Sequence, residues 1–243
     1  MIESKRLGIL GVYLLPNLFT IGAMFAGFYS VVSTVRGQYA ESAVAIFVAF
    51  FMDGLDGRIA RLLDAQSAFG VQLDSLSDMV SFGIAPALVV YSWSLEIIGR
   101  TGWLSAFFYM VCSALRLARF NVQIKKIDGN YFQGLPAPPA AALMASIVWV
   151  CGTYNIKGGS VAFPMMVTVL FLGMLMVSTV RYRSFKNISL YNRISFMKTL
   201  GVALILTIVM FSPSDILLVL SFLYVIFGPI ETLRFLYKKR FKK

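Results

Sequence analysis

The chain has 243 residues, of which 58% are hydrophobic and only 14% are charged, a composition that excludes an ordinary soluble domain and predicts an all-α, polytopic helical membrane protein. A net charge of +11 is also found in nucleic-acid-binding proteins, but in a membrane protein the meaning of the basic residues depends on where they lie along the chain. Histidine is absent, which excludes His-ligated zinc and a Ser-His-Asp triad, and the two cysteines, Cys112 and Cys151, fall in apolar segments and indicate neither a disulfide framework nor a thiolate metal site.

In chain order, a polar juxtamembrane segment at residues 1–8 comes first and is expected to lie on the membrane surface. No cleavable signal peptide is expected, because the first apolar segment contains Pro16 and Asn17 and lacks a cleavage pattern at its end. Eight apolar segments follow, each near the ~20 residues that a spanning helix needs. The seventh is short, so a re-entrant hairpin at the end of the chain is the alternative. The predicted spans are 10–34, 40–63, 69–94, 101–123, 136–155, 160–181, 197–212 and 214–236.

The distribution of Lys and Arg predicts the orientation of these spans. With both termini on one side, 19 of the 22 basic residues fall on that side, and only Arg36, Arg100 and Lys157 fall on the other. Because basic residues concentrate in cytoplasmic loops, both termini are predicted to be cytosolic. The same bias, together with attraction to anionic lipid head groups, accounts for the positive charge without nucleic acid. The whole chain, 1–243, is expected to form a single membrane domain ending in a basic tail at 237–243.

An acidic stretch at residues 53–78 is the least expected feature of this apolar chain, since it holds five of the eleven acidic residues. An ionised Asp at membrane depth costs on the order of 2.5 to 3.5 kcal/mol on insertion scales. The helical repeat places Asp53 and Asp56 about 60° apart, on one face of the second span. Asp74 and Asp78 are about 40° apart and share one face of the third span. Each pair is therefore expected to act together.

A short turn is predicted between the second span, which ends near Asp64, and the third, which begins near Ser67 as its N-cap. At ~1.5 Å per residue, the two Asp pairs then meet at matching depth. Four converging carboxylates repel one another, and divalent cations relieve this repulsion. Oxygen-only ligands favour Mg²⁺, Mn²⁺ or Ca²⁺, and a pair of such ions stabilises phosphoryl displacement. The alternative is a proton or cation pathway, while Asp64 is interpreted as a helix cap or a solvated residue.

Small and basic residues next to this cluster suggest space and charge for an anionic ligand. Gly57 and Gly70 remove side chains beside the carboxylates, although glycines in membrane helices also serve simple helix packing. Arg61 lies one turn beyond Gly57 and can point toward an anion held there.

The acidic stretch resembles the signature of the CDP-alcohol phosphotransferase family, which reads D-x-x-D-G-x-x-A-R, eight residues, then G-x-x-x-D-x-x-x-D. The resemblance implies a six-helix membrane core, here 10–181, with a further helical pair at 197–236. It also implies a cytosol-facing active site in an integral membrane homodimer, and transfer of a phosphoryl-alcohol group from a CDP-linked donor to a second alcohol with release of CMP. The fixed positions are filled by Asp53, Asp56, Gly57, Ala60, Arg61, Gly70, Asp74 and Asp78.

Three further segments resemble the phosphatidylserine synthase branch of that family: L-P-N-L-F-T at 15–20, A-L-R-L-A-R-F-N at 114–121 and F-Q-G-L-P-A-P-P-A-A at 132–141. This branch implies CDP-diacylglycerol as donor, L-serine as acceptor and two divalent cations, Mg²⁺ or Mn²⁺. By matching position, the four metal ligands would be Asp53, Asp56, Asp74 and Asp78, with Asp78 also the general base and Arg61 assisting electrostatically. The residues expected to contact the donor are Asn17, Thr20, Gly57, Ala60, Arg61, Ser67 and Gly70.

An acceptor with a carboxylate needs a cation in its pocket. Arg116 and Arg119 lie one turn apart near the cytosolic end of the fourth span, and Asn121 follows, so these three residues are predicted to bind serine. For the arginines the alternative is anchoring to the membrane surface, and for Asn17 and Thr20 it is hydrogen bonding between helices.

Other activities remain open at this point. Within the family, the acceptor is alternatively glycerol phosphate or inositol phosphate. A cation-coupled transporter would more often place its carboxylates near the membrane midplane on broken helices. A membrane scaffold without catalytic activity would leave the four aspartates unexplained.

Overall fold

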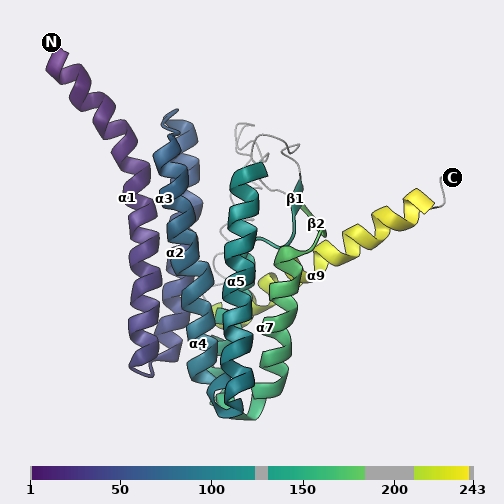
Figure 1. Cartoon of the computed structure of the whole chain (residues 1–243). Coiled ribbons are helices and arrows are strands. Elements are labelled where there is room, and N and C mark those ends of the chain that lie inside the picture. Colours follow the sequence, from purple (N-terminus) through teal and green to yellow (C-terminus); the bar gives the residue numbers. More distant parts are fainter. Residues whose placement is uncertain (1, 124–130, 184–210, 241–243) are drawn as a thin grey trace.

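The computed structural model describes residues 2–123, 131–183 and 211–240, which form a bundle of long helices (Figure 1). The long helices are α1 (Ile2–Val35), α2 (Tyr39–Leu62), α3 (Ala68–Asp78), α4 (Ala85–Trp93), α5 (Arg100–Gln123), α6 (Ala137–Thr153), α7 (Ala162–Val177) and α9 (Pro213–Arg240). A π-helix, η1 (Met79–Ile84), joins α3 to α4, and the 3₁₀ turns are η2 (Leu95–Ile98) and η3 (Gly158–Val161). Two short strands are β1 (Tyr131–Gln133) and β2 (Arg181–Arg183).

The prediction of a polytopic helical membrane protein is confirmed. Five helical stretches are long and apolar enough to cross a membrane, and α6 is a shorter apolar helix. Seven of the eight predicted spans coincide with helices of the structure, while nearly all of the seventh, 197–212, lies outside the described residues. The five stretches are Leu14–Val35, Ala68–Trp93, Arg100–Val122, Gly158–Val177 and Pro213–Thr232.

Two features differ from the sequence-based expectation. The segment at residues 2–8 is continuous with the first span, since α1 begins at Ile2 without a break. The strands β1 and β2 pair antiparallel, with Phe132 opposite Tyr182, so the fold includes a small two-stranded ribbon that an all-α prediction omits. The ribbon lies at the end of the bundle toward which the amino end of α1 and the carboxyl end of α9 also point (Figure 1).

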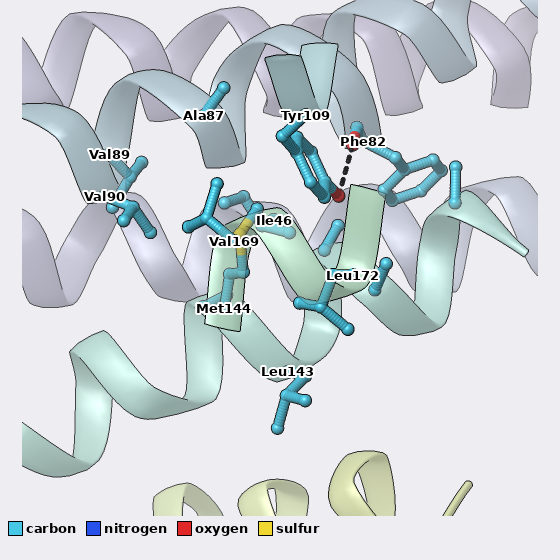
Figure 2. Close-up of a cluster of buried hydrophobic side chains, with 14 of the residues drawn as sticks. Ile46, Phe82, Ala87, Val89, Val90, Tyr109, Leu143, Met144, Val169 and Leu172 are labelled. Carbon is cyan, nitrogen blue, oxygen red and sulfur yellow. Dashed lines mark hydrogen bonds between the residues drawn. The ribbon is translucent and has the colours of Figure 1, made fainter. Parts of the chain in front are cut away.

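The third predicted span is one rod made of α3, η1 and α4, and it switches to π geometry directly after Asp78. Pro86 has no backbone N–H, so the carbonyl of Phe82 loses its helical donor. The hydroxyl of Tyr109 replaces that donor at 3.0 Å, as Figure 2 shows. Ser81 donates to the carbonyl of Ala23 at 3.0 Å, which ties the π-helix to α1. A buried backbone group freed by an irregular helix thus finds a partner on a neighbouring helix.

Small side chains on α6 allow close packing at the centre of the bundle. The side chains of Ala140, Ala141 and Ala145 are buried in a cluster that includes Ile46 of α2 and Val89 of α4. Small residues at such contacts allow helix backbones to approach closely, which is how membrane helices associate without a hydrophobic driving force between them. This packed centre holds α2 against α4, and α4 continues through η1 into α3, so it positions the two helices that carry the acidic residues.

Candidate active site

Three carboxylates from two antiparallel helices converge at the site. Asp53 and Asp56 of α2 and Asp74 of α3 each offer an oxygen, and these oxygens lie within 4.8 Å of one another. The predicted N-cap is confirmed, because the backbone N–H of Gly70 donates to Ser67 Oγ at 3.0 Å. The cap starts α3 right after a tight turn, and the turn brings the two helix faces together. Asp64 sits in that turn, exposed, and is not among the three converging residues.

The first helix supports this cluster with a hydroxyl group. Thr20 of α1 is buried and donates to Asp56 Oδ2 at 2.7 Å, while also lying 3.2 Å from the carbonyl oxygen of Pro16. Ser77 of α3 in turn donates to the carbonyl of Thr20 at 3.0 Å. Thr20 therefore fixes one rotamer of the Asp56 carboxylate and links α1 to both acidic helices.

Asp78 lies next to the three converging residues. Its carboxyl group contacts that of Asp53, and its Oδ1 is buried without a hydrogen-bond partner among the described residues. An orphaned carboxylate oxygen beside three others is costly in a helical membrane interior unless a cation or a proton satisfies it. The donor set consists of carboxylates alone, which suits a hard divalent cation. The four aspartates therefore fit the divalent ions expected from the sequence.

One side of the cluster has room for a ligand. A Cβ atom added at Gly54 or Gly57 would meet no atom within 4 Å, so packing within the chain does not require glycine at either position. Arg61 is exposed on the same helix and donates through Nε to the carbonyl of Gly57 at 2.8 Å. Ala60 follows Asp56 by one turn and shares its face.

Gly70, by contrast, is closely surrounded. A Cβ atom there would lie 3.1 Å from Ser67 Oγ and 3.4 Å from Asn17 Oδ1. Asn17 and Ser67 therefore meet beside Gly70 at the edge of the acidic cluster. The residues of α1, α2 and α3 that are predicted to contact the CDP-linked donor substrate thus lie in one region of the bundle.

The three polar residues predicted on α5 separate into different environments. Arg116 is 9% exposed, stacks over the ring of Phe120 at 5.7 Å, and lies within electrostatic range of Asp78 and Asp53. Asn121 donates to Ser75 Oγ at 2.8 Å and so ties α5 to α3. Arg116 is therefore the basic residue of α5 that faces the aspartates.

Arg119 turns to backbone carbonyls instead. Its guanidinium donates to Val177 O at 2.9 Å, Gln133 O at 2.9 Å and Met176 O at 3.0 Å. It thereby holds the ribbon and the end of α7 against α5. Sequence reasoning missed this arrangement, because every residue has a backbone carbonyl and the sequence does not show which carbonyls accept hydrogen bonds from a side chain.

With this geometry in hand, comparison with known proteins identifies the family. The family model described as CDP-alcohol phosphatidyltransferase matches residues 13–180, more than half of the chain. The chain belongs to this family. The matched region contains α2, α3 and every residue of the acidic cluster, so the resemblance read from the aspartate signature is confirmed.

Curated relatives of this CDP-alcohol phosphatidyltransferase family member extend the match over nearly the whole chain. A protein of Helicobacter pylori named CDP-diacylglycerol–serine O-phosphatidyltransferase is 35% identical over 232 residues, covering 96% of each chain. Relatives with the same name are 33% identical in Bacillus subtilis, over 71% of this chain and 91% of the relative, and 33% identical in Methanocaldococcus jannaschii, over 78% and 83%. The predicted similarity to the phosphatidylserine synthase branch is thereby confirmed.

Proposed function

We propose that this protein is an enzyme that transfers the phosphatidyl group of CDP-diacylglycerol to the hydroxyl of L-serine, forming phosphatidylserine and releasing CMP. The observation that supports this most directly is the meeting of Asp53, Asp56 and Asp74 within 4.8 Å, with a buried arginine beside them. The names of relatives that align over nearly the whole chain support serine as the acceptor.

The four aspartates would hold two divalent cations, Mg²⁺ or Mn²⁺. When bound, such ions neutralise charge on a pyrophosphate and on the departing phosphate. The Thr20 hydroxyl keeps Asp56 in a ligating orientation, because a hydrogen bond to the second oxygen of a ligating carboxylate orients it. The open surface at Gly57 lets the donor approach α2, and Arg61 supplies positive charge on that side.

Asp78 accepts the proton of the serine hydroxyl in this proposal. The serine oxygen forms a bond to the phosphorus that bears diacylglycerol, and the bond from that phosphorus to the CMP oxygen breaks. CMP leaves with the bonding electron pair, and the proton stays on Asp78 until solvent removes it. Asp78 would hold a cation through one carboxylate oxygen, and its Oδ1, which is buried with no hydrogen-bond partner among the described residues, would then take the proton.

Serine binding is assigned to the α5 side of the cluster. Arg116 would bind the carboxylate of serine while the serine hydroxyl reaches Asp78, and the electrostatic interaction of Arg116 with Asp78 supports this role. Asn121 borders the same region through Ser75. The hydrogen bonds of Arg119 to backbone carbonyls favour a role in holding the pocket wall rather than in contacting serine.

The membrane arrangement completes the proposal. Residues 1–243 form a single membrane domain with a six-helix core at 10–181, a helical pair at 197–236 and both termini in the cytosol, so that the active site opens to the cytosol. The bias of Lys and Arg supports this orientation, because basic residues concentrate on the cytosolic side. A homodimer in the cell membrane is the assembly expected from the family.

Parallel acceptor assays test this function. Purified protein in detergent micelles with CDP-diacylglycerol and Mg²⁺ or Mn²⁺ is supplied with serine, glycerol 3-phosphate or inositol phosphate, and CMP release is measured. We expect release with serine. Release with another acceptor only would overturn the serine assignment, and none with any acceptor would favour a transporter or scaffold.

A matched pair of variants connects the activity to the cluster. Asp56→Asn removes a charge from the converging set, whereas Asp64→Asn removes the same charge from the exposed turn of the same hairpin. We expect the first to abolish CMP release and the second to retain it. Equal activity in both would contradict the assignment of the metal centre.

A further inference from the structure

The carboxyl end of α5 is joined to α3 by a short chain of hydrogen bonds. Asn121 Nδ2 donates to Ser75 Oγ at 2.8 Å, and Ser75 Oγ donates to Val71 O, one turn earlier in α3, at 3.0 Å. Because the hydroxyl proton goes to Val71, the oxygen of Ser75 accepts from the amide of Asn121. The two bonds together fix the rotamer of Ser75 and hold one point on the surface of α3.

Ser75 lies between two of the aspartates along α3. It follows Asp74 directly and precedes Asp78 by three residues. At about 100° per residue, Asp74 and Asp78 both lie on the same side of Ser75, about 100° and about 60° away around the helix. The hydrogen bond from α5 therefore acts at a residue beside the acidic face of α3.

A second hydrogen bond holds α3 from another direction. Ser77 Oγ donates to the carbonyl of Thr20 in α1 at 3.0 Å. Ser75 and Ser77 are about 160° apart around the helix, so α5 and α1 hold α3 on nearly opposite sides. Together the two bonds resist rotation of α3 about its own axis more than either would alone.

The part of α5 that carries Asn121 is itself held in place. Arg119, two residues earlier, donates to backbone carbonyls of β1 and of the end of α7. Tyr109, farther back on α5, donates to Phe82 O in η1 at 3.0 Å. The two hydrogen bonds that α5 makes to the rod of α3, η1 and α4 thus fall before and after Asp78 in the chain. This arrangement makes α5 a fixed support for α3.

The geometry of a bound cation makes small rotations of α3 important. A carboxylate oxygen lies ~5–6 Å from the helix axis, so rotation by about 10° moves it by about 1 Å. Ligand distances at a metal site hold to within about 0.2 Å, and Mg²⁺ requires near-ideal octahedral geometry. The oxygens of Asp53, Asp56 and Asp74 lie within 4.8 Å of one another, so a shift of that size would open the set.

We propose that Asn121 is a positioning residue for the metal centre, because through Ser75 it sets the rotation of α3 and with it the places of Asp74 and Asp78. This inference rests on the metal centre of the proposed function. It assigns Asn121 a role in metal affinity, whereas the sequence-based prediction places it in contact with serine.

The test measures Mn²⁺ binding by electron paramagnetic resonance in purified full-length protein without substrates. Asn121→Leu nearly keeps the side-chain volume and removes the amide, and Ser75→Ala removes its partner. We expect each variant to raise the Kd for Mn²⁺ about tenfold, the lower end of the range for loss of an outer-shell partner, because the bond acts one step away from the ligands. The double variant should show no further loss, since both changes remove the same bond. The KM for serine at saturating Mn²⁺ should stay near the wild-type value.

Ser221→Ala is the matched control. Ser221 of α9 also donates to a carbonyl four residues earlier, Leu217 O, at 2.7 Å, and it also joins a second helix, through Ser146 Oγ of α6 at 3.3 Å. Its loss should lower the Tm and leave the Kd for Mn²⁺ unchanged. A rise in Kd equal to that of Ser75→Ala would indicate general loosening of the bundle and would overturn the positioning role.

The other outcomes separate this inference from the function it rests on. If wild type binds Mn²⁺ and both Asn121→Leu and Ser75→Ala bind it equally well, the positioning role is wrong and the metal centre stands. A rise in the KM for serine with an unchanged Kd for Mn²⁺ would instead make Asn121 a serine ligand. If wild type binds no Mn²⁺, the metal centre and this inference fall together.

Discussion

The hydroxyl of Thr20 provides a direct test of the metal centre without touching a carboxylate. Thr20→Val is nearly isosteric and removes the 2.7 Å hydrogen bond to Asp56. A hydrogen bond to a charged group contributes about 1.5 to 3 kcal/mol, and loss of an outer-shell partner typically costs roughly 10- to 100-fold in metal affinity. We therefore expect the Mg²⁺ or Mn²⁺ concentration for half-maximal CMP release to rise within that range, while kcat at saturating metal stays near the wild-type value.

Thr34 on the same helix is a matched control. It is buried like Thr20, and its hydroxyl lies 2.8 Å from the carbonyl of Ser30, four residues earlier, as that of Thr20 lies near the carbonyl of Pro16. Its other partner is Ser42 Oγ at 2.7 Å rather than a carboxylate. Thr34→Val should lower thermal stability without changing the metal dependence. An unchanged metal dependence in Thr20→Val, or the same shift in both variants, would refute the proposed link between Thr20 and the metal ligands.

Three further predictions address the base, the donor surface and the pocket wall. Asp78→Asn should reduce kcat by at least about 10²-fold, the usual range for loss of a general base, while the KM for CDP-diacylglycerol stays nearly unchanged. Normal turnover at saturating metal would contradict the base assignment. Gly57→Val should raise the KM for CDP-diacylglycerol, because the added side chain would occupy the surface that the donor approaches. It should not lower the Tm, because a Cβ atom at Gly57 meets no atom of the chain within 4 Å. An unchanged KM would mean that the donor does not contact this surface. Arg119→Leu should lower the unfolding free energy by about 2 kcal/mol, because four backbone carbonyl oxygens lose the guanidinium as a donor. A large rise in serine KM without a drop in Tm would instead make Arg119 a substrate ligand.

The sequence predicts the acidic site well because its geometry is local. Asp53 and Asp56 share a helix face through the 3.6-residue repeat, and a turn of a few residues with Ser67 as N-cap brings Asp74 opposite them. Hydropathy locates the spans for a similar reason, since a helix must cover the bilayer thickness with apolar residues. Where one helix and its adjacent turn determine an arrangement, residue spacing suffices to predict it.

The features that sequence reasoning missed depend on contacts between distant segments. Tyr131 and Arg183 pair across the ribbon although 52 positions separate them, and three-residue strands show no usable periodicity. Pro86 alone predicts only a kink, whereas the hydrogen bond that Tyr109 donates from another helix to the carbonyl of Phe82 is visible only in the fold. Arg119 has the same composition and local context as a membrane-anchoring arginine, and only the fold reveals its carbonyl partners.

Charge balance supports the proposal that the four aspartates and Arg116 form one functional unit. Four carboxylates face a single buried guanidinium, so the described side chains leave this part of the membrane domain strongly negative. Such an excess is unstable in a low-dielectric interior unless cations or protons offset it. Two divalent ions would change the net charge of the site from negative to positive, which would favour binding of the two negative charges of a pyrophosphate. The single positive charge of Arg116 cannot neutralise four carboxylates. With cations bound to the aspartates, the charge of Arg116 would remain available for the carboxylate of the acceptor.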